Sequence, residues 1–362
     1  MAHPYLTREF YENAHREHGC FPRSLEALCT EAERLAADPA AASGFVDLVE
    51  ILRNMKKWQM RIAISDNVSM TNALAVAALV PDIIDGLMRD GFSREISEKT
   101  VLDVDESIMA PTLKGEAPGL DVALVQWFLH FINLDIVRIG RLNFERVHEW
   151  HGRANVYENA AGEEVIFPYH IGMNAEGGAC QHGEDMAFFA TITEEDGMIC
   201  GHRAVNGIAE RAITRLPKSE WKLVLQFGDP TIGVHIPDKE PFDVATLEAT
   251  YQEALPILKK CWPELHPKAL TCQSWLMDHQ MDTFLRPESN IVQFHKPFTQ
   301  IPARANNTSA LNYVFGEVPK SFENLPEDNS MRRGMKALYM RGGSIRFAFA
   351  YWLLRDGERK QK

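Results

Sequence analysis

The chain has 362 residues and a formal net charge of -12 at pH 7, and this length favours two domains over one. Proteins that bind nucleic acids carry a basic surplus or a basic face, so the acidic balance argues against a nucleic-acid partner. The six cysteines form no Cys-x-x-Cys pair, which argues against structural zinc and is typical of a reducing compartment.

The amino-terminal part, residues 5–132, is predicted to be mostly helical. Its first ten residues lack the apolar core of a secretory signal, so we expect a cytoplasmic protein. Helical apolar spacing covers residues 25–37, 45–64, 72–79, 81–90 and 122–132, and the prolines at 39, 81 and 111 are interpreted as interruptions. The apolar stretch 122–139 contains Gln126, Asp135 and Arg138, which makes it too polar for a membrane span and predicts a buried helix that runs into a strand.

From residue 138 onward the pattern changes to strands. Apolar runs or alternation predict strands near Leu142 and Phe144 and at 221–227, 232–236, 270–276 and 345–352, with helices near 244–255 and 331–340. Residues 160–215 are predicted only as irregular hairpins. The fold class expected is therefore α+β or α/β: a helical domain, residues 1–137, followed by a mixed β-sheet domain with crossover helices, residues 138–362.

The segment 228–237 has the pattern of an active-site strand. Its isoleucines and valine alternate onto one face, His235 lies on the other, and Pro237 ends the strand because it has no backbone donor. Asp243 can then cap the next helix. His235 is thus expected near the carboxyl end of a strand and close to a helix amino terminus. The alternative is a core histidine without a catalytic role.

Several collinear motifs resemble those of bacterial acyltransferases with a GNAT-like carboxyl-terminal domain and an amino-terminal N-acyltransferase domain. They are Arg138-Ile-Gly-Arg-Leu-Asn-Phe-Glu145, Gly228-Asp-Pro-Thr-Ile-Gly-Val-His-Ile-Pro237, Thr271-Cys-Gln-Ser-Trp-Leu-Met-Asp278, Ser289-Asn-Ile-Val-Gln-Phe-His-Lys-Pro-Phe298 and the helix-glycine-strand segment 325–352. The resemblance covers roughly residue 94 to the end. It implies a GNAT-type fold that moves an acyl group from a thioester to an amine, with coenzyme A (CoA) as the usual carrier.

The resemblance also implies where the thioester binds. It would lie in a wedge between two splayed parallel strands, with its pyrophosphate at a helix amino terminus, where free backbone donors favour anions. The chain lacks the GNAT phosphate-loop pattern, and Asp238, Glu240 and Asp243 surround the expected pyrophosphate position, where carboxylates repel phosphate. Two donors therefore stay open: acyl-CoA held in a different way, and an acyl carrier protein thioester.

Four residues are candidates for catalysis. His235 is expected to take the proton of the amine, since its unperturbed pKa lies near working pH. Glu145 is the second candidate base, directly or through water, with a salt-bridged strand carboxylate as the alternative. Ser274 can donate to the leaving thiolate, and Asp278 either joins it or caps the following helix. Cys272 shares the face of Ser274, which leaves a covalent acyl-cysteine step as a further alternative.

Five residues are assigned to binding of the thioester. Ile236 ends the first strand of the wedge, and Trp275 follows the second, where a core position is the alternative. The basic cluster Arg332, Arg333 and Lys336 is predicted to hold the phosphates of CoA or the acidic surface of a carrier protein. Its alternative is a solvated helix face.

The function predicted first is an N-acyltransferase that uses acyl-CoA or an acyl carrier protein thioester. The acceptor is an amine of a small molecule or peptide, with a lysine- or ornithine-like side chain among the possibilities, and Trp127, Phe128 and Phe131 offer apolar surface for a fatty acyl chain. The alternative is a catalytically silent GNAT-like module that binds an acyl chain or a partner. A hydrolase using His148 and His151 is a distant third, because their spacing does not fit zinc, and no metal is expected.

Overall fold

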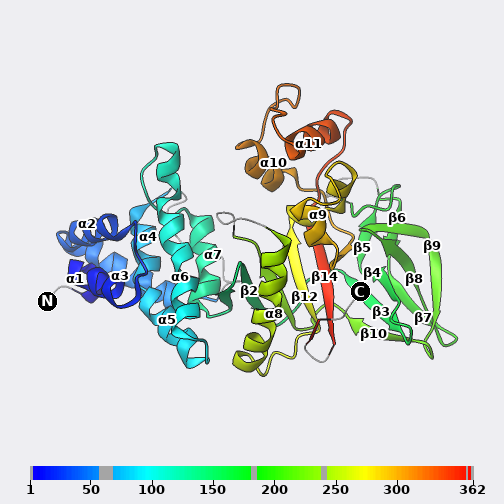
Figure 1. Ribbon diagram of the computed structural model, residues 1–362, viewed down its shortest axis with the longest axis horizontal. Helices are drawn as coiled ribbons and strands as arrows, with labels where there is room; N and C mark the ends of the chain where they lie inside the picture. The colour runs from blue at the N-terminus through cyan, green and yellow to red at the C-terminus, as the bar shows by residue number, and fades with distance from the viewer. Residues whose placement is uncertain (1–2, 57–67, 181–185, 238–242, 356–357, 360–362) are drawn as a thin grey trace. The chain divides into compact units, whose positions relative to one another are not determined.

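The computed structural model describes residues 3–56, 68–180, 186–237, 243–355 and 358–359, which separate into two compact units (Figure 1). The amino-terminal unit comprises residues 1–145 together with 252–262, and the carboxyl-terminal unit comprises residues 146–251 and 263–362. The predicted domain boundary at residues 137 and 138 falls inside strand β1 (Ile136–Ile139). A helical region followed by a mixed β-sheet region confirms the α+β class.

The amino-terminal unit packs helices around an apolar core and ends in a β-hairpin. Its helices are η1 (Pro4–Leu6), α1 (Arg8–His18), α2 (Leu25–Ala36), α3 (Pro39–Asn54), α4 (Met70–Ala77), α5 (Val80–Arg89), α6 (Arg94–Met109), η2 (Ala110–Lys114) and α7 (Val122–Ile132). The hairpin joins β1 to β2 (Leu142–Val147) in antiparallel register. Asp121 caps α7 by accepting from the amide of Leu124 at 2.8 Å. The prediction of a buried helix at 122–132 that runs into a strand is confirmed.

The helix predicted at 45–64 needs correction at its start. Helix α3 begins at Pro39, because the Asp38 carboxylate accepts from the amides of Ala40 and Ala41 at 2.9 and 3.3 Å. A proline in the first helical position needs no intrahelical donor, so it starts this helix instead of interrupting it. Residues 57–64 of the prediction lie outside the described residues.

Within the described residues, one helical stretch is both long enough and apolar enough to cross a membrane. It is Met70–Arg89, which contains α4 and α5, and 72% of its most apolar window is buried within the structure. The core helices of globular proteins have the same properties, and this burial favours a place in the core of the unit.

The carboxyl-terminal unit contains an antiparallel sheet in the order β10-β3-β4-β8-β7, with β9 beside β8. The strands of this region are β3 (Ala154–Asn159), β4 (Glu164–Pro168), β5 (Ile171–Met173), β6 (Phe188–Ala190), β7 (Ile192–Glu195), β8 (Met198–Val205), β9 (Ile208–Pro217) and β10 (Trp221–Leu225), of which β5 and β6 form a separate pair. The prediction of hairpins at 160–215 is confirmed, but most of their strands are regular members of a sheet and not irregular. The strands carry polar residues at many outward positions, and tight turns such as Asn206-Gly207, both with positive φ, join them.

The second sheet of this unit contains a parallel pair. Strand β11 (Thr231–His235) is followed by helix α8 (Val244–Cys261) and by the parallel strand β12 (Ala269–Ser274). Strand β14 (Ala348–Arg355) lies next to β12 and runs antiparallel to it. The strands β13 (Thr299–Ile301) and β15 (Glu358–Arg359) both pair with β14, also in antiparallel orientation. The predicted strand at 270–276 ends at Ser274, because η3 (Trp275–Met277) begins there, and the strand predicted at 345–352 is shifted to 348–355.

Strand β14 shows what covers each face of this sheet. Tyr351 and Leu353 lie in one apolar core with Val156 and Ile166 of the antiparallel sheet. The intervening Trp352 makes an edge contact with Tyr251 of α8, with ring centroids 5.6 Å apart. Successive strand residues point to opposite faces. One face therefore packs on the antiparallel sheet and the other carries α8.

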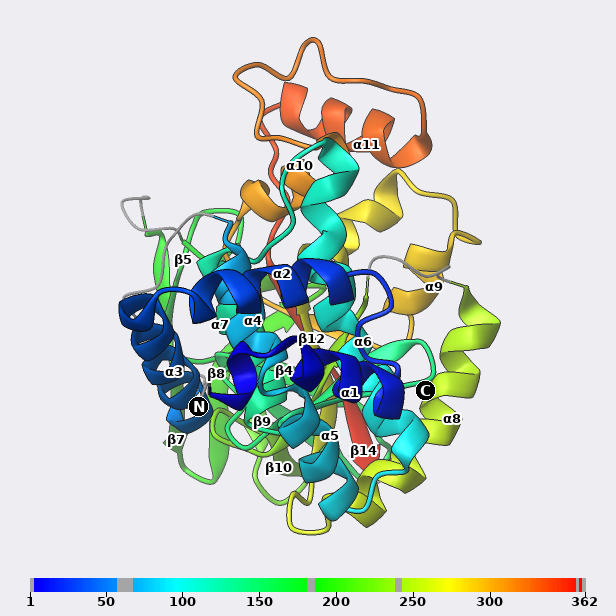
Figure 2. The same cartoon turned by 90° about the vertical axis from the view of Figure 1, so that its left-hand side faces the viewer.

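The remaining helices form a small lobe, which we call the helical lobe. It contains η3, η4 (His279–Thr283), α10 (Asn307–Phe315) and α11 (Ser330–Met340), and α9 (Asn290–His295) lies against η4. Figures 1 and 2 both place α10 beside α11. Met281, Leu311, Met335 and Tyr339 share its apolar core. The predicted helix at 331–340 is confirmed as α11.

Candidate functional site

The parallel strands β11 and β12 pair over a short distance only. Their register pairs Ile232 with Leu270 and Gly233 with Thr271. Continued pairing would set His235 opposite Gln273, but both strands continue beyond the last pair without pairing further with each other. We call these two carboxyl-terminal strand ends, residues 234–235 and 272–274, which do not pair with each other, the splay.

Helix α8 begins after β11, and a carboxylate caps its start. Asp243 accepts from the amide of Thr246 at 2.9 Å and from its hydroxyl at 2.5 Å. The hydrogen bond from the Thr246 hydroxyl has the largest effect and that from the amide the next largest, and they hold the pKa of Asp243 below its usual value. A negative charge therefore occupies the position at which the family resemblance places a pyrophosphate. The other predicted carboxylates there, Asp238 and Glu240, lie outside the described residues.

His235 occupies the last position of β11 and is half-buried, as is Ile236 after it. Alternation puts His235 on the face of Gly233, and the parallel register puts Thr271 and Gln273 on that same face. His235 and Gln273 therefore lie on one side of the sheet at the splay. The catalytic role of His235 and the binding role of Ile236 stay predictions.

Ser274 and Trp275 connect the splay to the helical lobe. The hydroxyl of Ser274 accepts from the amide of Leu276 at 3.1 Å and so caps η3. The ring of Trp275 lies 5.9 Å from that of Tyr313 and packs against the core of the lobe. Both side chains thus have structural contacts, and their predicted roles in acyl transfer and thioester binding are compatible with their place at the end of β12.

Asp278 is fully buried and holds the helical lobe to the segment that leads into β14. Its carboxylate accepts from the backbone amide of Arg346 at 2.7 Å and from its guanidinium at 3.3 Å. It also accepts from the amide of Gln280 at 3.1 Å, which caps η4. The capping alternative for Asp278 is therefore present in the structure, and its catalytic role stays a prediction.

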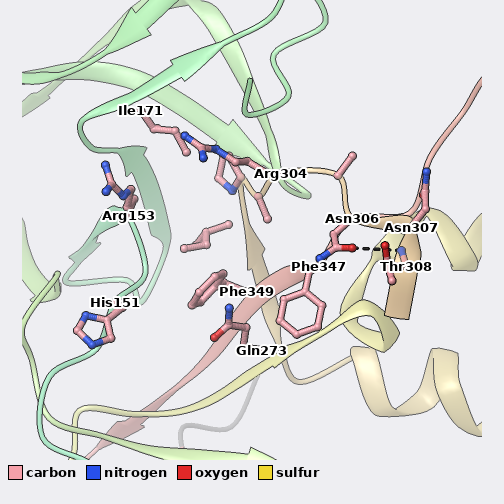
Figure 3. Close-up of a pocket in the computed structure, with 14 residues that line it drawn as sticks. His151, Arg153, Ile171, Gln273, Arg304, Asn306, Asn307, Thr308, Phe347 and Phe349 are labelled. Carbon is pink, nitrogen blue, oxygen red and sulfur yellow. Dashed lines mark hydrogen bonds between the residues drawn. The ribbon is translucent and has the colours of Figure 1, made fainter. Parts of the chain in front are cut away.

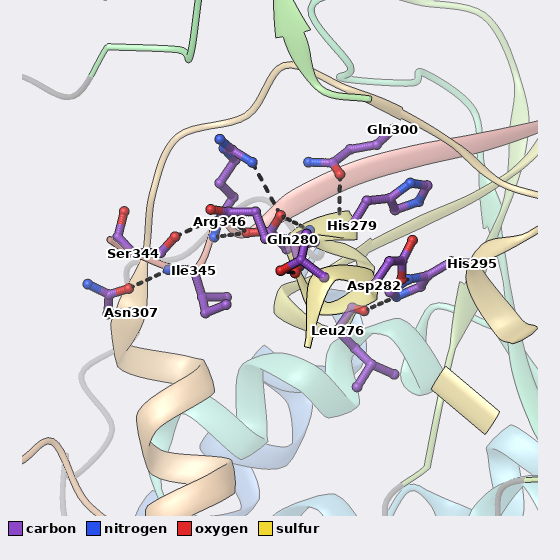
Figure 4. Close-up of polar contacts among 12 residues, drawn as sticks. Leu276, His279, Gln280, Asp282, His295, Gln300, Asn307, Ser344, Ile345 and Arg346 are labelled. Carbon is purple, nitrogen blue, oxygen red and sulfur yellow. Dashed lines mark hydrogen bonds and ion pairs between the residues drawn. The ribbon is translucent and has the colours of Figure 1, made fainter. Parts of the chain in front are cut away.

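A second polar cluster in Figure 4 fixes α9 to η4. His295 is 1% exposed, and its Nδ1 lies 2.7 Å from the Asp282 carboxylate. Its Nε2 lies 2.5 Å from the carbonyl oxygen of Leu276. Both ring nitrogens therefore face acceptors, which is the arrangement of a structural histidine.

Glu145 belongs to the amino-terminal unit, at the position of β2 that pairs with Ile136. It is 8% exposed, and its carboxylate lies 3.0 Å from Nδ1 of His130 on α7. Glu145 thus has a hydrogen-bonding partner of the kind that the structural alternative expects, and its role as a base stays a prediction.

Each member of the basic cluster on α11 has a local partner. Arg332 pairs with Asp328 at 2.9 Å, and Lys336 pairs with Glu327 at 2.7 Å. Arg333 donates to the backbone carbonyl of Glu327 at 2.8 Å. These contacts tie α11 to the segment that precedes it, and the phosphate-binding role predicted for the cluster stays a prediction.

The thiol of Cys272 is poorly suited to a covalent step. Burial raises its pKa to about 12. A thiol at that pKa is almost entirely protonated near neutral pH, whereas the thiolate is the nucleophile. Cys272 is therefore disfavoured as a covalent nucleophile.

A cavity of about 750 Å³ opens beside the splay, on the face that carries Gln273 (Figure 3). Gln273 and its cross-strand partner Phe349 both line it, together with Ile301, which also pairs with Phe349. The segment 302–308, which ends in the first turn of α10, forms another wall. This volume is within the range of small-molecule sites.

The charged side chains around the cavity are all basic. Arg153 and Arg304 line it, as does His151, and none of its fourteen lining residues is acidic. Arg153 donates to the carbonyl oxygen of His170 at 2.9 Å, and the His151 ring lies 5.5 Å from that of Phe227. His148 is exposed. In the described part of the chain, no three His, Cys, Asp or Glu residues are grouped as a metal site.

Comparison with protein families shows which family the chain belongs to. A family model described as the GNAT-like C-terminal domain matches residues 136–350, well over half of the sequence. The chain belongs to this family. The match covers the antiparallel sheet, the splay, the helical lobe and the first residues of β14. No curated protein sequence matches the chain.

Solved structures with this GNAT-like arrangement extend over nearly the whole chain. An acyltransferase mutant in complex with octanoyl-CoA has a TM-score of 0.62 and 15% identity, and the match covers 96% of this chain and 88% of that one. An acyltransferase in complex with decanoyl-CoA and teicoplanin has a TM-score of 0.60 and 16% identity, over 95% and 87% of the two chains. At these identities the likeness establishes the fold.

The sequence analysis missed the cavity residues. Gln273 lies within a quoted motif, and its alternation with Cys272 and Ser274 was the available signal. Arg304 follows β13, for which no strand was predicted, and Arg153 precedes β3 in a region without assigned structure. Both reach the cavity only through the packing of the two sheets.

Proposed function

We propose that this GNAT-like protein is an N-acyltransferase that moves an acyl group from an acyl-CoA thioester to an amine. The observation that supports this most is the splay. The register of the parallel strands β11 and β12 ends at the pair Gly233–Thr271, and His235 lies on the same face as the cavity residue Gln273. Backbone groups of separated strands can hold the amide groups of a pantetheine chain.

The solved structures of similar fold support the same class of reaction. Their descriptions name acyltransferases in complex with octanoyl-CoA, with decanoyl-CoA and teicoplanin, and with CoA and 10C-teicoplanin. We take from them a CoA thioester as the donor, with an acyl carrier protein thioester as the alternative. The capped start of α8 then requires that the pyrophosphate bind away from Asp243.

The proposed chemistry is a single displacement. The neutral amine nitrogen attacks the acyl carbon, the carbon–sulfur bond breaks, and an amide and CoA thiolate are produced. His235 takes the proton of the amine, and a donor at the splay, for which Ser274 is our candidate, returns a proton to the thiolate. General base catalysis of this type contributes about 10²–10⁴-fold to a rate.

The test combines binding and turnover. We expect wild-type protein to bind octanoyl-CoA at one site, more tightly than CoA in a calorimetric titration, and to release CoA thiol when a suitable amine is added. His235→Ala should lower kcat by about 10²–10⁴-fold and leave the affinity for octanoyl-CoA within about twofold. His148→Ala, which removes an exposed histidine, is the matched control and should retain full activity.

Three outcomes would contradict the proposal in different ways. Absence of thioester binding would remove CoA as the donor and direct attention to carrier-protein thioesters. Binding without turnover across free amino acids, lysine- and ornithine-containing peptides and amino sugars would favour the silent binding module. Full activity of His235→Ala would refute the base role while leaving acyl transfer intact.

We also propose a cytoplasmic location and a bacterial N-acyltransferase type of amino-terminal unit. The location is supported by the six cysteines, each of which is buried and free of disulfides. Fractionation of the native host, with a disulfide-bonded periplasmic marker as the reference, tests it.

A further inference from the structure

We infer that the cavity beside the splay is the acceptor site and that it selects amines that also carry a carboxylate, as amino acids and peptides with a free carboxyl terminus do. This inference rests on the proposed acyl transfer and adds the chemical class of the acceptor. The structural basis is a cavity of about 750 Å³ that is lined by two arginines and aromatic rings and joins the splay at Gln273.

The cavity and α8, the helix that follows β11, lie on opposite faces of the sheet. Gln273 pairs with Phe349, and Tyr351 on the same face of β14 packs on the antiparallel sheet. Trp352, on the opposite face, contacts Tyr251 of α8. The cavity therefore lies on one face of the sheet and α8 on the other. A thioester approaching from the side of α8 and an acceptor in the cavity would meet at the splay.

The charges indicate what the cavity binds. Among the described residues, neither Arg304 nor Arg153 has a carboxylate partner, although the protein carries a net charge of -12. Two unneutralised guanidinium groups around a cavity without acidic side chains favour an anion. Guanidinium groups bind carboxylates through paired, charge-assisted hydrogen bonds.

The apolar part of the lining indicates the rest of the ligand. Phe347 and Phe349 are half-buried and line the cavity beside Gln273 (Figure 3). Phe227, which is 50% exposed, lies next to His151 at the rim. An amine with an apolar or aromatic body and a carboxylate would place the amine toward Gln273, the body on the rings and the carboxylate on the arginines.

The probes are N-octanoyl-L-phenylalanine and its carboxamide, which represent the product with and without the carboxylate. Protein saturated with CoA is titrated with each probe by calorimetry. We expect the acid to bind about 10- to 100-fold more tightly than the amide, the effect of a charged hydrogen-bonded pair. Arg304→Gln and Arg153→Gln should reduce this ratio toward one. Arg211→Gln, which changes an exposed arginine on β9, is the control and should preserve it.

A second titration tests whether the arginines of the cavity bind the carboxylate of the acceptor or a phosphate of the donor. CoA and dephospho-CoA are titrated into wild type and Arg304→Gln. We expect unchanged affinities for both, whereas a selective loss of CoA affinity would assign the cavity to the donor phosphate and overturn the inference. Equal binding of acid and amide by wild type, or binding of neither, would also overturn it. Failure of octanoyl-CoA to bind at all would instead remove CoA as the donor in the proposed function.

Discussion

The carboxyl-terminal unit contains two groups of basic side chains with opposite local surroundings. On α11, Arg332 and Lys336 pair with Asp328 and Glu327, which lie in the segment just before the helix. Around the cavity, Arg153 and Arg304 have no such carboxylates among the described residues. The basic cluster on α11, which is the denser of the two in sequence, is therefore the one whose charges are neutralised by carboxylates. The availability of a positive charge depends on which carboxylates fold beside it.

The strongest test of this comparison concerns the buried ion pair that anchors the helical lobe. Asp278→Ala leaves the Arg346 guanidinium, 17% exposed, without its carboxylate. Breaking a buried pair costs about 3–5 kcal/mol, so the urea midpoint should fall sharply. Asp328→Ala, which removes the exposed partner of Arg332, is the matched control and should cost under about 1 kcal/mol. Equal losses of stability in the two variants would show that the buried pair contributes no more than the exposed pair.

A smaller effect is expected from the packing of α11 within the lobe. Gly334 lies inside α11, and an added Cβ would overlap the ring of Phe284. Gly334→Ala should therefore destabilise the protein by about 1–3 kcal/mol despite the better helix propensity of alanine. Gly44, inside α3, has no atom within 4 Å of the added Cβ. Gly44→Ala should stabilise by about 0.5–1 kcal/mol, as measured by urea unfolding.

A gain of stability in Gly334→Ala would contradict the packing described for α11 and Phe284. It would mean that the lobe is looser than these contacts indicate. Circular dichroism of both variants checks that neither change alters the helix content.

The smallest effect concerns the basic cluster itself. Arg332→Ala/Arg333→Ala should lower stability by about 1 kcal/mol or less, because the pairs are exposed. We expect its affinity for octanoyl-CoA to stay within about twofold of wild type in a calorimetric titration, because both side chains already have internal partners. A large loss of affinity would support the phosphate-binding role predicted from the sequence and would reverse the comparison between the two groups.

The elements with a strong apolar pattern could be predicted from the sequence. Helix α7 and strand β11 were found nearly to the residue, because their apolar positions follow the helix and strand periods without interruption. The individual strands of residues 160–215 were not found, since polar residues occupy many of their outward positions. Pro39 was misread because its effect depends on Asp38, which caps the helix that it starts.

The motifs with His235 and Ser274 were also recognisable from the sequence, since strand alternation and a terminating proline are local properties. The tertiary structure alone decided which residues meet at the cavity. Gln273, Phe349 and Arg304 come from three segments that are brought together by the pairing of β12, β14 and β13. The ion pairs of α11 are local by contrast, since Asp328 and Arg332 are four residues apart. The cavity depends on contacts between residues far apart in the chain, which no local pattern of residue types encodes.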